Sequence, residues 1–119
     1  MQEVADRPWA QPEAERLEEL KGFAVEHLLE ARLALGEREQ VVPDADLAVK
    51  EYPLREQRWA TLMVALCRCG RQAEALRTYQ RLRTLLCDEL GIDPSPLLTA
   101  LEAAVLRQDP SLQPPTAKL

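Results

Sequence analysis

Apolar residues recur at steps of three and four along most of the chain, which is the spacing of one face of an α-helix. Glycine and proline interrupt this pattern where helices would begin or end. The pattern predicts five helices, which cover about residues 12–35, 36–53, 54–69, 72–90 and 95–108. The fold class that follows is all-α, with antiparallel helical hairpins and with residues 1–108 forming one helical domain.

The first two predicted helices differ in how regular their pattern is. The first has one apolar stripe, which consists of Leu17, Leu20, Ala24, Leu28, Ala31 and Leu35. The second is interrupted by Pro43, and a proline inside a helix removes one hydrogen bond and clashes with the preceding turn. We therefore expect a break or a kink at Val42, with the firm part of the helix from Pro43 to Glu51.

The third and fourth predicted helices are each apolar on two sides, so the third is expected to lie between neighbouring helices. The stripes of the third consist of Trp59, Leu62, Met63 and Leu66, and of Ala60, Val64 and Cys67. Those of the fourth consist of Ala75, Tyr79, Leu82 and Leu86, and of Leu76, Cys87 and Leu90.

The fifth predicted helix has clear signals at its start. Gly91 closes the fourth helix in a left-handed conformation, Pro94 follows in a turn, and Ser95 is the N-cap with Pro96 as the first helical residue. The apolar side of this helix consists of Leu97, Leu98, Leu101, Ala104 and Val105. Residues 109–119 contain three prolines and are expected to form a disordered tail.

An internal repeat underlies the hairpins. The interval from Gly36 to Gly70 equals the tetratricopeptide period of about 34 residues. In the second copy, the small Ala75 lets two helices approach closely, and Tyr79 fills the face beside it. Repeats of this kind need neighbours to bury their apolar faces, and two hairpins leave the N-terminal end uncovered. We therefore predict a tetratricopeptide-like fold whose uncovered face promotes self-association.

Composition and charge limit the classes of protein to which the chain can belong. The chain is 46% hydrophobic but 4% aromatic, so leucine and alanine do most of the packing, which favours helices. The net charge of −5 argues against a chain that binds nucleic acid directly. The charge is uneven: residues 1–53 contain thirteen acidic and six basic residues, and residues 54–119 contain seven acidic and nine basic residues.

No motif for catalysis or for a cofactor stands out, so we predict that the protein is not an enzyme. The one histidine, His27, has no nucleophile and orienting partner in its pattern, and it is interpreted as a surface residue. Cys67 and Cys69 point apart on a helix and cannot share a metal ion, so the three cysteines are interpreted as core thiols. Without a signal peptide or an apolar run long enough to span a bilayer, we expect a cytoplasmic protein and no membrane contact.

Arginines on and near the fourth helix are the candidate partner-binding residues: Arg68, Arg71, Arg77 and Arg81. Such a cluster would bind an acidic protein segment or a phosphate backbone. The alternative is that Arg77 or Arg81 pairs with Glu74 on the helix surface. Trp59 and Tyr79 suggest base stacking, but their spacing on apolar stripes favours core packing. Trp9 is expected to dock on the bundle ahead of the first helix.

Several segments together resemble the bacterial transcriptional activation domain of the Streptomyces antibiotic regulatory protein family. The similar segments are residues 4–10, 13–20, 53–56, 62–66, 106–110, Gly70-Arg71-Gln72-Ala73-Glu74-Ala75-Leu76, and Glu89-Leu90-Gly91-Ile92-Asp93-Pro94-Ser95-Pro96. In that family the domain usually begins with about two further helices and follows a winged-helix DNA-binding domain, and this sequence starts late in the pattern.

The resemblance implies a helical domain that acts in dimerisation, in regulation or in contact with transcription machinery such as RNA polymerase. The matching residues Gly70, Ala75, Tyr79, Gly91, Pro94 and Ser95 are expected to be structural. A different function stays open, namely a general tetratricopeptide-like adaptor that binds a peptide or helix in a groove and has no role in transcription.

Overall fold

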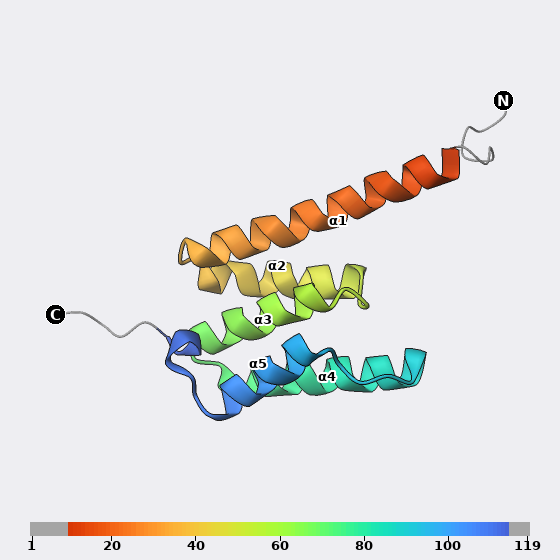
Figure 1. Cartoon of the computed structure of the whole chain (residues 1–119). Helices are drawn as coiled ribbons and strands as arrows, with labels where there is room; N and C mark the ends of the chain where they lie inside the picture. The colour runs from red at the N-terminus through yellow and green to blue at the C-terminus, as the bar shows by residue number, and fades with distance from the viewer. Residues whose placement is uncertain (1–9, 115–119) are drawn as a thin grey trace.

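The structure of the protein is a computed structural model that describes residues 10–114, and regular structure in this range is entirely helical (Figure 1). The five helices confirm the predicted all-α fold. In chain order the elements are α1 (Ala10–Ala34), α2 (Arg38–Glu51), α3 (Glu56–Arg68), α4 (Gln72–Leu90), α5 (Pro96–Leu106) and the 3₁₀ helix η2 (Pro110–Leu112). None of these helices combines the length and hydropathy that a membrane span requires.

Helix α3 lies at the centre of the core. It packs against α2, α4, α1, α5 and η2, as its two apolar stripes predict. Met63 and Ala65 are fully buried, and Trp59 is 4% exposed, with its indole N–H donating to the Pro53 carbonyl oxygen at 2.8 Å. The tryptophan is therefore a core residue whose polar atom has a partner.

Helix α4 begins and ends at the predicted residues and buries the first of its two predicted faces. Ala75 and Leu82 are fully buried and Tyr79 is 5% exposed. On the second face, Leu76 packs against the core, whereas Leu90 is 55% exposed and Cys87 is also exposed. Helix α5 is too short to cover this end of α4.

The turns after α1, α3 and α4 use the three glycines Gly36, Gly70 and Gly91, with φ angles of +93°, +79° and +66°. These left-handed conformations are strained for residues with a side chain, which accounts for glycine there. Ser95 precedes α5 in an extended conformation, and its N–H donates to Glu56 Oε1 at 3.0 Å. With Pro94 buried, this bond ties the start of α5 to the start of α3.

The prediction of a break at Val42 is wrong. Helix α2 runs without interruption from Arg38 to Glu51 with Pro43 inside. The proline lies in the second turn and is exposed, and it deprives only the carbonyl of exposed Glu39 of a partner. Water can solvate that carbonyl. Burial of Val41 and Ala45 on the other face maintains the helix.

The C-terminal segment corrects the expectation of disorder from residue 109. Asp109 accepts hydrogen bonds from the N–H and hydroxyl of Ser111, at 2.9 and 2.7 Å, and begins η2. Leu112 is 6% exposed and belongs to the hydrophobic core. The Arg68 Nε donates to the Ser111 carbonyl at 3.3 Å. The segment is thus fastened to α3 up to Pro114, and residues 115–119 lie outside the described range.

Candidate interaction surface

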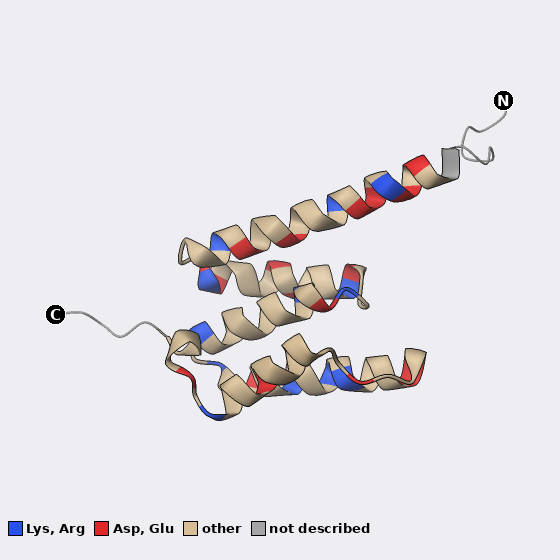
Figure 2. Cartoon of the chain, in the orientation of Figure 1, with Lys and Arg blue, Asp and Glu red and all other residues tan. Residues whose placement is uncertain are grey.

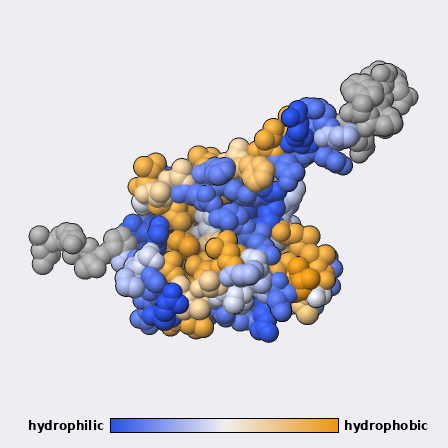
Figure 3. Space-filling view, in the orientation of Figure 1, coloured by the Kyte–Doolittle hydropathy of each residue, from blue (hydrophilic) through white to orange (hydrophobic). Residues whose placement is uncertain are grey.

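The apolar stripe of α1 faces solvent. Leu17 is 51% exposed, Leu28 is 59% exposed and Leu35 is 78% exposed. The core is instead contacted by the opposite side of the helix, through Leu29 and Leu33. Figure 3 shows the resulting patches of hydrophobic surface along α1. Exposed apolar patches of this kind mark contact sites for other proteins.

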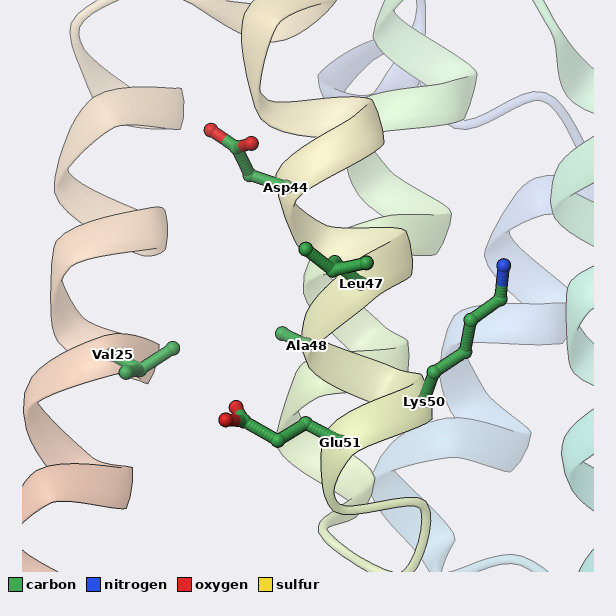
Figure 4. Close-up of a pocket in the computed structure, with 6 residues that line it drawn as sticks. All are labelled: Val25, Asp44, Leu47, Ala48, Lys50 and Glu51. Atoms are coloured by element: carbon green, nitrogen blue, oxygen red, sulfur yellow. The ribbon is translucent and has the colours of Figure 1, made fainter.

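A groove between α1 and α2 adjoins this stripe and holds an open cavity of about 440 Å³. In Figure 4, Val25 points from α1 toward Leu47 and Ala48 of α2. Asp44 and Glu51 also point toward α1 and lie above and below this apolar centre in that view. The side chain of Leu47 is 68% exposed, so the groove presents aliphatic surface with carboxylates at its two ends.

One end of the groove is fixed by Arg32 of α1. Its Nη1 donates to Asp44 Oδ2 at 2.7 Å, and its Nε donates to Glu37 Oε1 at 3.0 Å. These bonds raise the pKa of the Arg32 guanidinium, with Asp44 as the main cause. The arginine therefore holds the start of α2 against the end of α1.

At the other end of the groove lies a buried ionic cluster of Glu26, Arg55 and Arg58. Both nitrogens Nε and Nη2 of Arg55 donate to the Glu26 carboxylate, and Arg58 Nε donates to Glu26 Oε2 at 3.0 Å. Burial raises the pKa of Glu26, but the hydrogen bonds from Arg55 and Arg58 outweigh it, and the net pKa is lowered. Glu26 is therefore a carboxylate at neutral pH.

Gly22 makes room for this cluster. A Cβ at that position would lie 3.0 Å from Cζ of Arg55, so a glycine lets the guanidinium pass close to α1. The Arg58 side chain is fully buried, and its Nη1 donates to the Ala48 carbonyl at 2.9 Å and to Glu51 at 3.2 Å. Its Nη2 is buried without a partner in the described part of the chain. The cluster joins α1, α2 and α3 through one arginine.

A second cavity, of about 490 Å³, continues the groove over this cluster. It shares Val25 and Glu51 with the first cavity and is also lined by Arg58 and Tyr52. The Tyr52 ring covers the Arg58 guanidinium at 5.0 Å, and its hydroxyl donates to Glu18 at 2.7 Å. The hydrogen bond to Glu18 raises the pKa of Tyr52, so the phenol keeps its proton. No group of metal-ligating side chains lies together in the described range.

The four candidate arginines do not form a single cluster of available cations. Arg68 binds the C-terminal segment, and Arg71 forms two hydrogen bonds with Glu74, at 2.8 and 2.7 Å. Arg81 lies 3.8 Å from Asp46 of α2 and 5.2 Å from the Trp59 ring. Arg77 is exposed and has no ion pair within residues 12–114. In Figure 2, α4 carries basic residues along its middle and acidic residues at its C-terminal end.

Other candidate residues have structural positions. Trp59 and Tyr79 are buried, so neither presents a ring for base stacking. Burial raises the pKa of Cys67, as expected for a core thiol. Cys87 is exposed, so the interpretation of all three cysteines as core residues is wrong. Trp9 lies outside the described residues. The periodicity of apolar residues did not identify Glu26 and Arg58 as buried residues.

Comparison with known proteins identifies relatives of this chain. The family model described as the bacterial transcriptional activator domain matches residues 1–106. The transcriptional regulatory protein EmbR of Mycobacterium tuberculosis is 37% identical over 110 residues, which are 92% of this chain and 28% of EmbR. The regulatory protein AfsR of Streptomyces coelicolor is 42% identical over 105 residues, which are 88% of this chain and 11% of AfsR.

A third relative and a solved structure extend this similarity. The regulatory protein DnrI of Streptomyces peucetius is 38% identical over 100 residues, which are 84% of this chain and 37% of DnrI. The structure of M. tuberculosis EmbR in complex with a low affinity phosphopeptide has a TM-score of 0.85 and 37% identity, and the match covers 95% of this chain and 29% of that chain. The chain therefore spans about a tenth to a third of the length of these regulators.

Proposed function

Because this chain belongs to the bacterial transcriptional activator domain family, we propose that it is the regulatory and protein-contact domain of a transcriptional activator. Its relatives are named as transcriptional regulators from actinobacteria, and bacterial transcription is a cytoplasmic process. We assign no direct contact with DNA to these residues and no catalytic step. The partner in this proposal is a protein, either a second copy of the chain or RNA polymerase.

The exposed stripe of α1 is the observation that carries this proposal. Its leucines, from Leu17 to Leu35, are half or more exposed, although the core on the opposite side of the helix is closed. The groove beside Leu47 extends this surface onto α2. An uncovered face of this length suits a helical contact with another protein.

The alternative is a general tetratricopeptide-like adaptor without a role in transcription. A cavity of about 300 Å³ on another face, lined by residues of α1, α3 and α5 that include Ala60 and Leu97, favours this interpretation. Adaptors of repeat type bind peptides on such surfaces. The two functions differ in whether the partner belongs to the transcription machinery.

Retention on purified actinobacterial RNA polymerase holoenzyme tests the proposal. The wild-type chain is expected to be retained, and Leu28→Glu on the stripe is expected to abolish retention. Leu106→Glu is the matched control, since Leu106 is 60% exposed on α5, away from α1. Arg77→Glu measures whether the exposed arginine of α4 contributes. Sedimentation at high concentration measures self-association, and a monomer that polymerase does not retain would leave the adaptor as the better interpretation.

A further inference from the structure

A cavity of about 300 Å³ lies on the face of the molecule that α1, α3 and α5 form together. Ala60, Thr61 and Val64 of α3 line it, with Leu33 of α1 and Leu101 of α5 on the two sides. Ala60 is 7% exposed and Leu33 is 8% exposed, so the cavity reaches the hydrophobic core. A mostly apolar cavity of this size with a few polar groups is typical of a site for a small molecule.

Contacts between elements close the two ends of this cavity. At one end, Gln57 Nε2 of α3 donates to Glu30 Oε2 of α1 at 2.7 Å. At the other end, Arg68 Nε donates to the Ser111 carbonyl at 3.3 Å, so η2 borders the cavity there. The ends lie about 16 Å apart along α3, at 1.5 Å per residue. The cavity is therefore a basin of limited length, and an extended peptide that ran along α3 would have to cross one of these contacts.

The open side of the cavity does not depend on where the chain begins. The internal repeat relates α1–α2 to α3–α4, so a hairpin placed ahead of α1 by the same interval would contact α1 as the first hairpin contacts α3. Gln57, which bonds to Glu30 of α1, corresponds to Phe23, so the first added helix would lie against Phe23. Helix α2 lies beside Leu62, which corresponds to the exposed Leu28, so the second would lie there. Neither helix would cover the cavity.

One end of the cavity carries a positive charge. The Arg68 side chain is partly buried, uses Nε for the Ser111 carbonyl, and forms no ion pair within residues 12–114. The other N–H groups of its guanidinium suit the oxygens of a carboxylate, sulfonate or phosphate. Glu30 lies at the opposite end and already accepts the hydrogen bond from Gln57. The end of the cavity beside η2 is therefore electrostatically complementary to an anion.

We propose that this cavity is a binding site for a small amphipathic acid. The apolar body of the ligand lies on Ala60 and Val64, between α1 and α5, and its one anionic group binds the Arg68 guanidinium. The inference goes beyond the proposed function, because it assigns to the domain a ligand that is not a protein. Binding of this acid does not require the stripe of α1 or any protein partner.

Two fluorescent dyes test the site, because they share an apolar ring system and differ in charge. Anilinonaphthalene sulfonate is anionic, phenylnaphthylamine is the same molecule without the sulfonate, and both brighten when they leave water for an apolar site. Titration of the full chain measures a Kd for each dye. Arg68→Gln is expected to weaken the sulfonate dye about tenfold and the neutral dye less than about twofold. Arg77→Gln, at the exposed arginine of α4, is the matched control and should change neither.

Further variants place the dye in the cavity. Ala34 is exposed and lines the cavity, so Ala34→Phe narrows it and is expected to weaken both dyes several-fold, whereas Ala103→Phe, exposed on α5 outside the lining, is the control. Leu97→Glu removes an apolar side and adds a negative charge, so it should weaken the sulfonate dye more than Leu106→Glu does. Leu97 and Leu106 are 56% and 60% exposed. Circular dichroism and urea midpoints verify that each variant is folded.

Competition identifies the chemistry of the ligand. Decanoate is expected to displace the sulfonate dye, and decyltrimethylammonium, with the same apolar chain and the opposite charge, is expected to leave it bound. An extended peptide of leucine and alanine with capped ends tests for a peptide in the cavity.

Three outcomes would overturn the acid site. They are equal affinities of the two dyes for wild type and Arg68→Gln, no effect of Ala34→Phe and Leu97→Glu, and displacement by the capped peptide but not by decanoate. The last would make the cavity a peptide site. Because the dye assay contains no polymerase, failure of the acid site leaves the proposed function standing, and loss of polymerase retention leaves the acid site standing.

Discussion

At the scale of single residues, Glu26 shows that a charged side chain can hold a core position when its partners are fixed. The carboxylate is 8% exposed and receives hydrogen bonds from Arg55 and the fully buried Arg58. Both arginines come from the segment around the start of α3, so the cluster determines how α1 lies against that segment. Removal of one charged residue from such a cluster destabilises the folded state by more than the whole cluster stabilises it. The remaining residues then keep buried charges without a partner.

Replacement of Glu26 by glutamine is therefore expected to destabilise the protein by about 2 to 4 kcal/mol at pH 7. Urea denaturation followed by circular dichroism measures the difference. Glu30→Gln is the matched control on the same helix, since the Glu30 side chain is 40% exposed and accepts a hydrogen bond from Gln57. A loss no larger than that of the control would show that the cluster contributes little.

The same residue predicts a dependence on acid. The folded state lowers the pKa of Glu26, so its contribution is complete above the unfolded-state pKa of about 4.3 and is lost as pH falls through the lower folded-state value. The stability difference between wild type and Glu26→Gln is therefore expected to be largest near pH 7 and to shrink below about pH 4. Urea midpoints of both proteins from pH 7 to pH 3 measure this. A difference that grows on acidification would contradict it.

At the scale of elements, the sequence predicts best where neighbours lie on both sides. The central stripes of α3 and the first face of α4 are buried as their periodicity indicates, and Gly70 and Gly91 mark their ends. For α1, periodicity identifies the apolar side of the helix but cannot say whether another helix covers it. The ionic cluster was not predicted, because charged residues ordinarily lie at the surface. The internal repeat could have indicated that Glu26 is buried, because Glu26 corresponds to Ala60, which lies on a predicted apolar stripe.

Helix α2 offers a test at this scale, because Pro43 lies inside a continuous helix. Pro43→Ala restores a donor for the Glu39 carbonyl and is expected to stabilise the protein by about 1 to 3 kcal/mol. Pro96→Ala is the control, since proline at the first position of α5 costs no hydrogen bond and its replacement should have little effect. Equal urea midpoints for Pro43→Ala and wild type would mean that the helix already accommodates the ring without cost.

At the scale of the whole molecule, the two ends of the described chain differ. The C-terminal end is closed, because η2 places Leu112 in the core beside α3. The N-terminal hairpin has an uncovered side along α1. Sequence composition suggested the reverse for the C-terminal segment, because the prolines and polar residues on both sides of Leu112 resemble a linker.

Truncation distinguishes an anchored segment from a linker. Removal of residues 109–119 exposes the site of Leu112 and is expected to cost about 2 kcal/mol, whereas removal of residues 115–119 alone should change stability by less than about 0.5 kcal/mol. Thermal and urea denaturation of the two truncated proteins measure this. Equal stability of both would mean that η2 does not hold Leu112 in solution.

The length of α1 has a consequence for amide exchange. Its side chains from residue 12 to 21 are exposed, and among residues 12–34 Glu18, bonded to Tyr52, is the first with a side-chain hydrogen bond to a residue outside α1. Amides ahead of Glu18 are expected to exchange with deuterium through local fraying, while those near Leu29 and Leu33 exchange only when the hairpin opens. One continuous helix is thus expected to open in two cooperative units. Slowed exchange at Leu17 and Leu20 would report, residue by residue, when a partner occupies α1.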